Sequence, residues 1–266
     1  MLKKLLKYEI KATGRIFLPM YALLIVLALI NKFFYSVNVD YLAIPQILTM
    51  TAFVAIIVGI FLMTLVVTIQ RFNKNLLTDE GYLSFTLPVQ AHSHINCKMI
   101  TTLMWLILSG IVSFISIFIM TINRETIDSF KNFFSLMGSA LAIAGIDGYI
   151  IFFEVIFLCI FGLLSEILSI YAAITIGNMS SKHKLLAGIG SYLGMGLIEQ
   201  FFATILITSF NGKIGTDFQL FGNYSAINQY RQAQTILLLL IVFVLVFGTA
   251  YYILTNWMLN NKLNLE

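Results

Sequence analysis

The chain has 266 residues, of which 59% are hydrophobic and only 11% charged, and its mean hydropathy is +0.93. A water-soluble domain carries about 25% charged residues, and one core of this size could not shield so much apolar surface from water. We therefore exclude a soluble domain and expect an all-α polytopic membrane protein, with lipid as the solvent for most of its surface. The net charge of +4 is attributed to basic residues at cytoplasmic helix ends, and nucleic acid is not expected as a partner.

Residues 1–15 are amphipathic when placed on a helix. Leucines, Glu9 and Ile10 fall on one side, while the lysines mostly fall on the other. This pattern predicts a short interfacial helix, with lysines near lipid headgroups and leucines near the acyl chains. The alternative is an ordinary basic flank of the first span. Both interpretations place the N-terminus in the cytoplasm, and no cleaved signal peptide is expected.

Six apolar segments are long enough to cross a membrane. They are residues 16–34, 44–69, 99–122, 149–173, 185–210 and 235–257. The fourth apolar region as a whole, residues 133–176, would be roughly 65 Å long as one helix, about twice the hydrocarbon thickness. We therefore expect a charged loop at 123–131, a short outer segment, a bend near Gly145 and Gly148, and then the fourth span.

The distribution of basic residues predicts the orientation. With the N-terminus inside, inner segments hold eleven of the 16 Lys and Arg residues and outer loops hold five. The excess of inner positive charge predicts a multi-pass protein of the cell membrane with both termini cytoplasmic. We expect residues 1–266 to form a single transmembrane domain, with a cytoplasmic loop at 71–98 and an extracellular loop at 211–231.

Motifs for catalysis or metal binding do not stand out. The sequence contains neither G-x-x-x-x-G-K-[ST] nor H-E-x-x-H, so we expect no ATP hydrolysis by this chain, no catalytic residues and no metal site. His92, Ser93 and His94 lie close together beside basic residues, which favours a solvated turn over a ligand set. The positions of Cys97 and Cys159 argue against a disulfide.

Acidic residues interrupt the apolar helices at Asp147, Glu154, Glu166 and Glu199. A charged carboxylate in the bilayer costs at least a few kcal/mol, so each must face protein, water or a cation, or carry a proton. Asp147 and Glu154 are seven positions apart and share one helix face. We predict that Glu154, Glu199 and Asp147 line a translocation path. The alternative is that Asp147, Glu166 and Glu199 merely approach the membrane interfaces.

The fifth apolar segment is rich in glycine. Gly190 and Gly194 form a G-x-x-x-G pattern, and Ala187, Ser191 and Gly194 fall on one helix face. Small residues at this spacing permit close approach of helix backbones. Tight helix packing is the simplest interpretation, and a hinge or a dimer contact is the alternative.

The segment at 78–89, TDEGYLSFTLPV, mixes charged with aromatic and apolar side chains in a predicted cytoplasmic loop. Such residues are unfavourable in water, so we expect the loop to dock on a partner. The alternative is that it folds back on the inner ends of the helices.

This segment resembles the run DEGYL-x-FTLPV of permease subunits of type-2 ABC exporters, as found in many Gram-positive members. The opening residues 6–11, LKYEIK, followed by Arg15, are also similar to the start of those subunits, and the layout of six spans agrees along the whole chain.

The resemblance implies a short cytoplasmic coupling helix that sits in a cleft of a separate ATPase subunit. The residues that would contact the ATPase are Thr78, Asp79, Glu80, Tyr82 and Phe85. It also implies that a second permease, identical or related, completes the transporter, and that the partner ATPase binds the ATP and Mg²⁺. This chain would itself hold no cofactor and would contact membrane lipid. The cargo would be amphiphilic, such as a peptide, a lipid-like compound or a drug.

Two other classes remain open. An ion-coupled secondary transporter would use intramembrane acids such as Glu154 and Glu199. An intramembrane enzyme would need paired acids or Glu/His clusters at matching depths, and the sequence offers little that meets this requirement.

Overall fold

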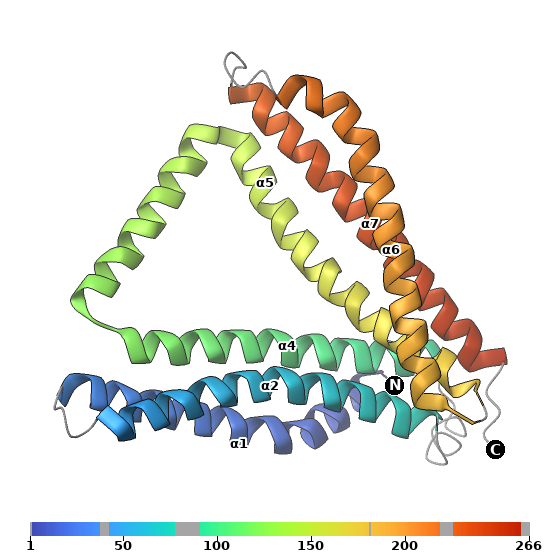
Figure 1. Cartoon of the computed structure of the whole chain (residues 1–266), viewed down its shortest axis with the longest axis horizontal. Coiled ribbons are helices and arrows are strands. Elements are labelled where there is room, and N and C mark those ends of the chain that lie inside the picture. The colour runs from blue at the N-terminus through green and yellow to red at the C-terminus, as the bar shows by residue number, and fades with distance from the viewer. Residues whose placement is uncertain (1, 38–42, 78–90, 181, 219–225, 262–266) are drawn as a thin grey trace. The chain divides into compact units, whose positions relative to one another are not determined.

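The computed structural model describes residues 2–37, 43–77, 91–180, 182–218 and 226–261, and the elements in these ranges are α-helices without a strand (Figure 1). In chain order they are α1 Leu2–Val37, α2 Ala43–Leu77, α4 Ala91–Thr121, α5 Arg124–Asn178, α6 Lys184–Phe218 and α7 Ala226–Asn261. All six contain stretches long and apolar enough to cross a membrane. The prediction of an all-α polytopic membrane protein is confirmed.

Contacts within the chain gather in two compact units. Unit 1 is Met1–Phe134 and unit 2 is Ser135–Glu266. The boundary falls inside α5, so the first turns of that helix belong to unit 1 and the rest to unit 2.

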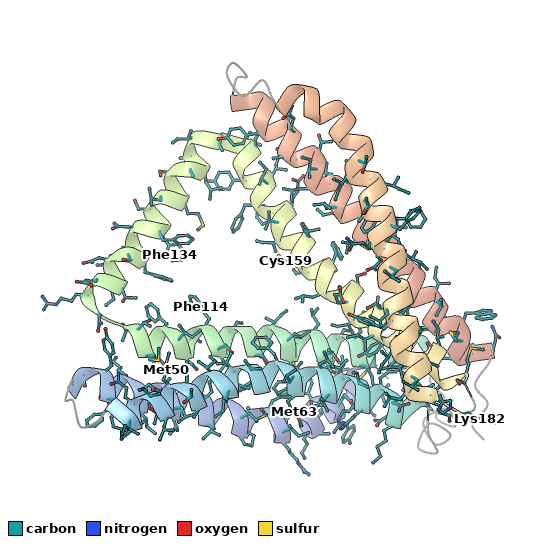
Figure 2. All side chains as sticks on the ribbon, in the orientation of Figure 1. Met50, Met63, Phe114, Phe134, Cys159 and Lys182 are labelled. Atoms are coloured by element: carbon teal, nitrogen blue, oxygen red, sulfur yellow. The ribbon has the colours of Figure 1, made fainter. Side chains whose placement is uncertain are left out.

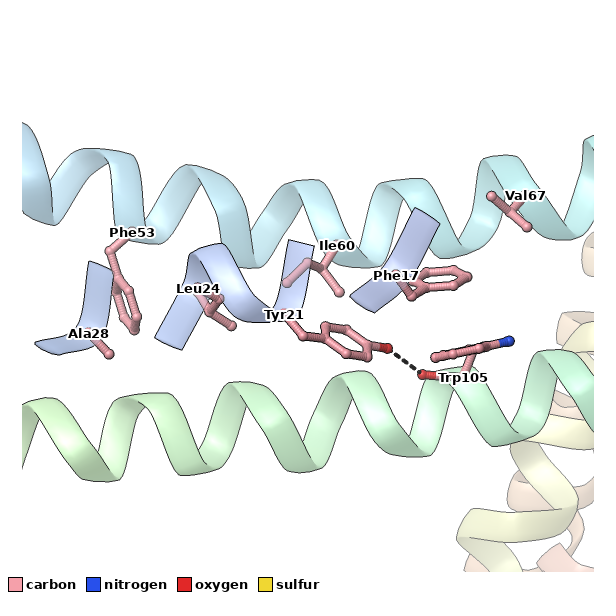
Figure 3. Packing of buried hydrophobic residues seen from close by; sticks show 8 residues of the cluster. All are labelled: Phe17, Tyr21, Leu24, Ala28, Phe53, Ile60, Val67 and Trp105. Carbon is pink, nitrogen blue, oxygen red and sulfur yellow. Dashed lines mark hydrogen bonds between the residues drawn. The ribbon is translucent and has the colours of Figure 1, made fainter. Parts of the chain in front are cut away.

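In unit 1, α1, α2 and α4 lie side by side (Figure 1). The residues buried between them are Phe17, Tyr21, Leu24, Ala28, Phe53, Ile60, Val67 and Trp105 (Figure 3). Those of α1 recur at three- and four-residue intervals, and those of α2 recur every seven residues, so each helix turns one stripe toward its neighbours. Other apolar side chains project outward, as Phe114 does with 59% of its surface exposed (Figure 2). Such side chains suit lipid.

Two boundaries in unit 1 differ from the sequence prediction. No break separates residues 1–15 from the first span, because α1 is continuous from Leu2 to Val37. Its buried stripe continues back through Thr13, so packing holds the amphipathic segment in line with the span. Likewise, α2 extends through the polar stretch after residue 69 to Leu77, because Phe72 and Leu76 are fully buried there.

In unit 2, the bend predicted in the fourth apolar region is confirmed at Gly145. Its φ of 59° and ψ of −138° interrupt α5, and this left-handed φ favours glycine. Gly148 lies just beyond the break, where an added Cβ would come within 2.6 Å of the Ala144 Cβ. The charged segment expected as a loop at 123–131 is instead helical from Arg124 onward.

The predicted extracellular loop at 211–231 is largely helical in the structure. α6 continues to Phe218 and α7 begins at Ala226, so only 219–225 lie outside the described residues. The described part of this segment therefore continues the two flanking helices.

Candidate functional site

The predicted coupling residues Thr78, Asp79, Glu80, Tyr82 and Phe85 lie outside the described residues. The helices on either side are described, α2 up to Leu77 and α4 from Ala91. The last turns of α2 and the first turns of α4 are thus the described residues nearest to this segment in the sequence.

Two turns from the loop on each side, a basic side chain reaches the same carboxylate of α1. The Lys98 Nζ donates to Glu9 Oε1 at 2.9 Å, and Arg71 Nη1 lies 3.4 Å from the same oxygen. Lys98 is only 7% exposed, so its ammonium has lost most of its water and depends on Glu9. Glu9 thus joins the N-terminal helix to both helices that flank residues 78–90.

A series of side-chain hydrogen bonds continues from Glu9 along α1 and α4. Thr13 Oγ1 donates to the Glu9 carbonyl at 2.8 Å and accepts from Trp105 Nε1 at 2.7 Å. Further along, the Tyr21 hydroxyl and Ser109 Oγ are 2.7 Å apart, and the same hydroxyl is 3.4 Å from the Trp105 carbonyl (Figure 3). Thr13, Tyr21, Trp105 and Ser109 therefore satisfy one another across this helix pair.

The indole of Trp105 makes a ring-stacking contact with α1 in addition to the hydrogen bond of its nitrogen. The rings of Phe17 and Trp105 are stacked with centroids 4.7 Å apart and planes 19° from parallel. The ring also lies close to the α1 backbone, since an added Cβ on Gly14 would be in ordinary contact with it at 3.6 Å. This combination fixes the position of α4 relative to α1 close to the ionic cluster.

Glu9, Arg71 and Lys98 were not predicted from the sequence to form a site. One signal was available, because Glu9 falls on the apolar side of the amphipathic segment, where a carboxylate needs a partner. Nothing in the sequence indicated which basic residue would supply it, since Lys98 is 89 positions away.

In unit 2, three of the four acids in apolar helices have a hydrogen-bond donor. Gln234 Nε2 lies 3.3 Å from Asp147 Oδ1, the Tyr251 hydroxyl donates to Glu199 Oε1 at 2.8 Å, and the Tyr192 hydroxyl lies 3.4 Å from Glu166 Oε2. The pairs join α5 to α7, α6 to α7 and α5 to α6, respectively.

Glu154 differs from these three acids. It is 8% exposed, and its Oε2 has no hydrogen-bond partner among the described residues. Of the predicted path residues, Asp147 and Glu199 therefore each have a donor on α7, and Glu154 has none among the described residues. Asp147 and Glu154 share the straight part of α5 beyond Gly145, whereas Glu199 belongs to α6 and is engaged by α7.

The close helix approach in unit 2 occurs at a different glycine from the one predicted. Gly190 and Gly194 have open space where a Cβ would be, so their G-x-x-x-G pattern makes no close contact inside the described chain. The contact lies instead at Gly177 of α5, whose added Cβ would be 2.7 Å from the backbone of Gly188. Beside it, Ser191 Oγ donates to the Ala173 carbonyl at 3.1 Å.

Within the described residues, no three His, Cys, Asp or Glu side chains come together in a way that could hold a metal ion. The chain was compared with models of protein families, with curated proteins and with solved structures, and none of them matches it.

Proposed function

We propose that the chain is the transmembrane permease subunit of an ATP-driven exporter of the type-2 ABC class, working with a separate ATPase. The six membrane-length apolar helices support a membrane-embedded transporter in general. The resemblance of residues 78–89 to the coupling segment of that class supports the specific assignment.

The structural observation that carries the proposal is the ionic cluster of Glu9, Arg71 and Lys98. A loop that transmits a movement must be joined rigidly to the helices that it moves, because a flexible joint would absorb the displacement. Here the two helices that flank the loop are joined to each other and to α1 through one carboxylate oxygen. Displacing the loop would therefore move α1, α2 and α4 together.

The proposed complex contains two permeases and cytoplasmic ATPase subunits that bind ATP and Mg²⁺. It lies in the cell membrane, with both termini of this chain cytoplasmic, as its excess of inner basic residues favours. The cargo is amphiphilic, since a path between apolar helices favours molecules with a large apolar part.

The coupling assignment is tested with this chain reconstituted together with an ABC ATPase that co-purifies with it. The double substitution Glu80→Lys with Tyr82→Ala should abolish the stimulation of ATP hydrolysis by the permease while the protein still inserts and folds. Glu125→Lys with Tyr149→Ala is the matched control, because both residues are exposed in α5 and lie outside the loop. The control should leave the stimulation unchanged.

Two results would contradict the proposal. One is full stimulation of the ATPase by the Glu80→Lys, Tyr82→Ala variant. The other is transport by the purified chain on a proton gradient without any ATPase, which would identify an ion-coupled carrier.

A further inference from the structure

In unit 2, Glu154 is a buried acid whose position the contacts of the described residues do not explain. It is more than nine-tenths buried in an apolar helix, and its Oε2 lacks a partner within the described residues. Asp147, Glu166 and Glu199, which also interrupt apolar stretches, each have an amide or a phenol as donor. An acid kept in this position without a donor is costly in lipid, so it indicates a role that involves something other than the chain itself.

The contacts of α5 with α7 show which way Glu154 faces. Asp147 meets Gln234, and further along Ser165 meets Gly248, where an added Cβ would be 3.5 Å from the Ser165 Oγ. Glu154 is seven positions after Asp147 and eleven before Ser165, so all three fall on one face of α5. Glu154 is therefore on the side of α5 that faces α7, between two points of contact.

Neither helix supplies a cation to this face. Residues 132–178 of α5 and 232–261 of α7 contain no lysine, arginine or histidine. Midway between Gln234 and Gly248 on α7 is Ile241, which offers no hydrogen-bonding side chain. A proton on Glu154 would remove the charge, but it would leave a hydroxyl donor that also needs an acceptor.

The turns of α5 around Glu154 are rich in aromatic side chains. Tyr149, Phe153 and Phe157 are each more than half exposed, and Phe157 stacks on Phe161 with ring centroids 6.0 Å apart. Aromatic faces attract organic cations through the ring quadrupole, and the attraction grows where water is excluded. A carboxylate beside such rings matches a positive charge that carries its own apolar groups.

We propose that Glu154 is the anionic anchor of a binding site for a lipophilic organic cation, formed where the α7-facing side of α5 meets the exposed flank that carries Phe153 and Phe157, about 100° and 60° round the helix from Glu154. The cation supplies the charge partner that the chain lacks, and its apolar groups replace lipid against the exposed rings. As an inference about cargo it rests on the proposed export function. As a binding site it depends only on unit 2.

The experiment uses the full chain in lipid nanodiscs without any ATPase, with radiolabelled tetraphenylphosphonium as the probe. Equilibrium binding should be saturable and should prefer this cation to neutral triphenylphosphine oxide and to tetraphenylborate. Glu154→Gln should lower the affinity at least about tenfold, as expected for loss of a desolvated charge partner. Glu166→Gln is the matched control, since it removes an acid of the same helix that already has Tyr192 as donor, and it should bind like the wild type.

The selectivity of the wild-type chain keeps the test decisive even where a variant folds poorly. Equal binding of the cation, the neutral compound and the anion would overturn the proposal, as would unchanged affinity in a folded Glu154→Gln variant. Glu154→Asp, which keeps the charge, should retain the preference for the cation. Because no ATPase is present, a negative result leaves the coupling assignment intact, and failure of the coupling assignment leaves a positive binding result intact.

Discussion

Substitution of Glu9 is expected to destabilise unit 1 more than substitution of either of its basic partners. Glu9→Gln removes the charge that balances Lys98, whose side chain is 8% exposed and whose Nζ lies 2.9 Å from Glu9 Oε1. Breaking a buried ion pair from one side costs about 3–5 kcal/mol, and the retained amide oxygen places the cost of this variant at about 3 kcal/mol.

The two basic residues should matter less, and unequally. Lys98→Met removes the buried charge itself and leaves Glu9 with Arg71 at 3.4 Å, so we expect a loss of about 1–2 kcal/mol. Arg71→Met should cost under about 1 kcal/mol, because its side chain is 27% exposed and retains access to solvent. The double variant Glu9→Gln, Lys98→Met leaves no buried charge without a partner, so it should be more stable than Glu9→Gln alone.

The assay is equilibrium unfolding by SDS titration in mixed micelles, followed by tryptophan emission. The chain has two tryptophans, so Trp257→Phe provides a background in which emission comes from Trp105 alone, in the core beside the cluster. If the loss of stability in the double variant equals the sum of the losses in Glu9→Gln and Lys98→Met, the assigned ion pair is refuted. A Lys98→Met variant as unstable as Glu9→Gln would refute it too.

Two further predictions concern helix contacts in unit 2. Gly177→Ala should destabilise by about 1–3 kcal/mol, because its Cβ would press on the backbone of Gly188 and overpacking outweighs the gain in helix propensity. Gly190→Ala, at a position with open space, is the control and should show no loss in the same SDS titration. Tyr251→Phe should cost about 1 kcal/mol through the lost hydrogen bond to Glu199, measured as a lower midpoint of thermal unfolding in detergent. An unchanged midpoint would show that this bond adds nothing to stability.

Much of the fold follows from the sequence because lipid imposes a simple rule. Backbone groups in the bilayer must be paired within the segment, so a long apolar stretch forms a helix. The length of the fourth apolar region also predicted a bend, because one straight helix would be about twice as long as the bilayer core is thick. Gly145, with its φ of 59°, lies where that bend was expected. Helix ends were harder to predict, because Phe72 and Leu76 extend α2 by packing against neighbours that hydropathy does not register.

The contacts of the candidate site could not be predicted, because they join residues of different helices. Glu9 and Lys98 are far apart in the sequence, and the basic residues near the helix ends looked alike as flanking charges. The glycine-rich stretch of α6 posed the same difficulty. The spacing of Gly190 and Gly194 predicted a close helix contact there, but α5 makes its close contact at Gly188. The reason is that packing sets the rotation of each helix about its axis, which the spacing alone does not give.

The two units satisfy their buried polar groups in different ways, and this difference separates two tasks. In unit 1, Lys98, Trp105 and Tyr21 each have a partner on another helix, which fixes the arrangement of α1 and α4. A rigid arrangement suits the transmission of a movement, since bonded groups resist independent displacement. In unit 2, Glu154 leaves an oxygen without a partner among the described residues, and such a group favours any state or ligand that supplies one. We therefore expect coupling variants to cluster around Glu9 and ligand-selectivity variants around Glu154.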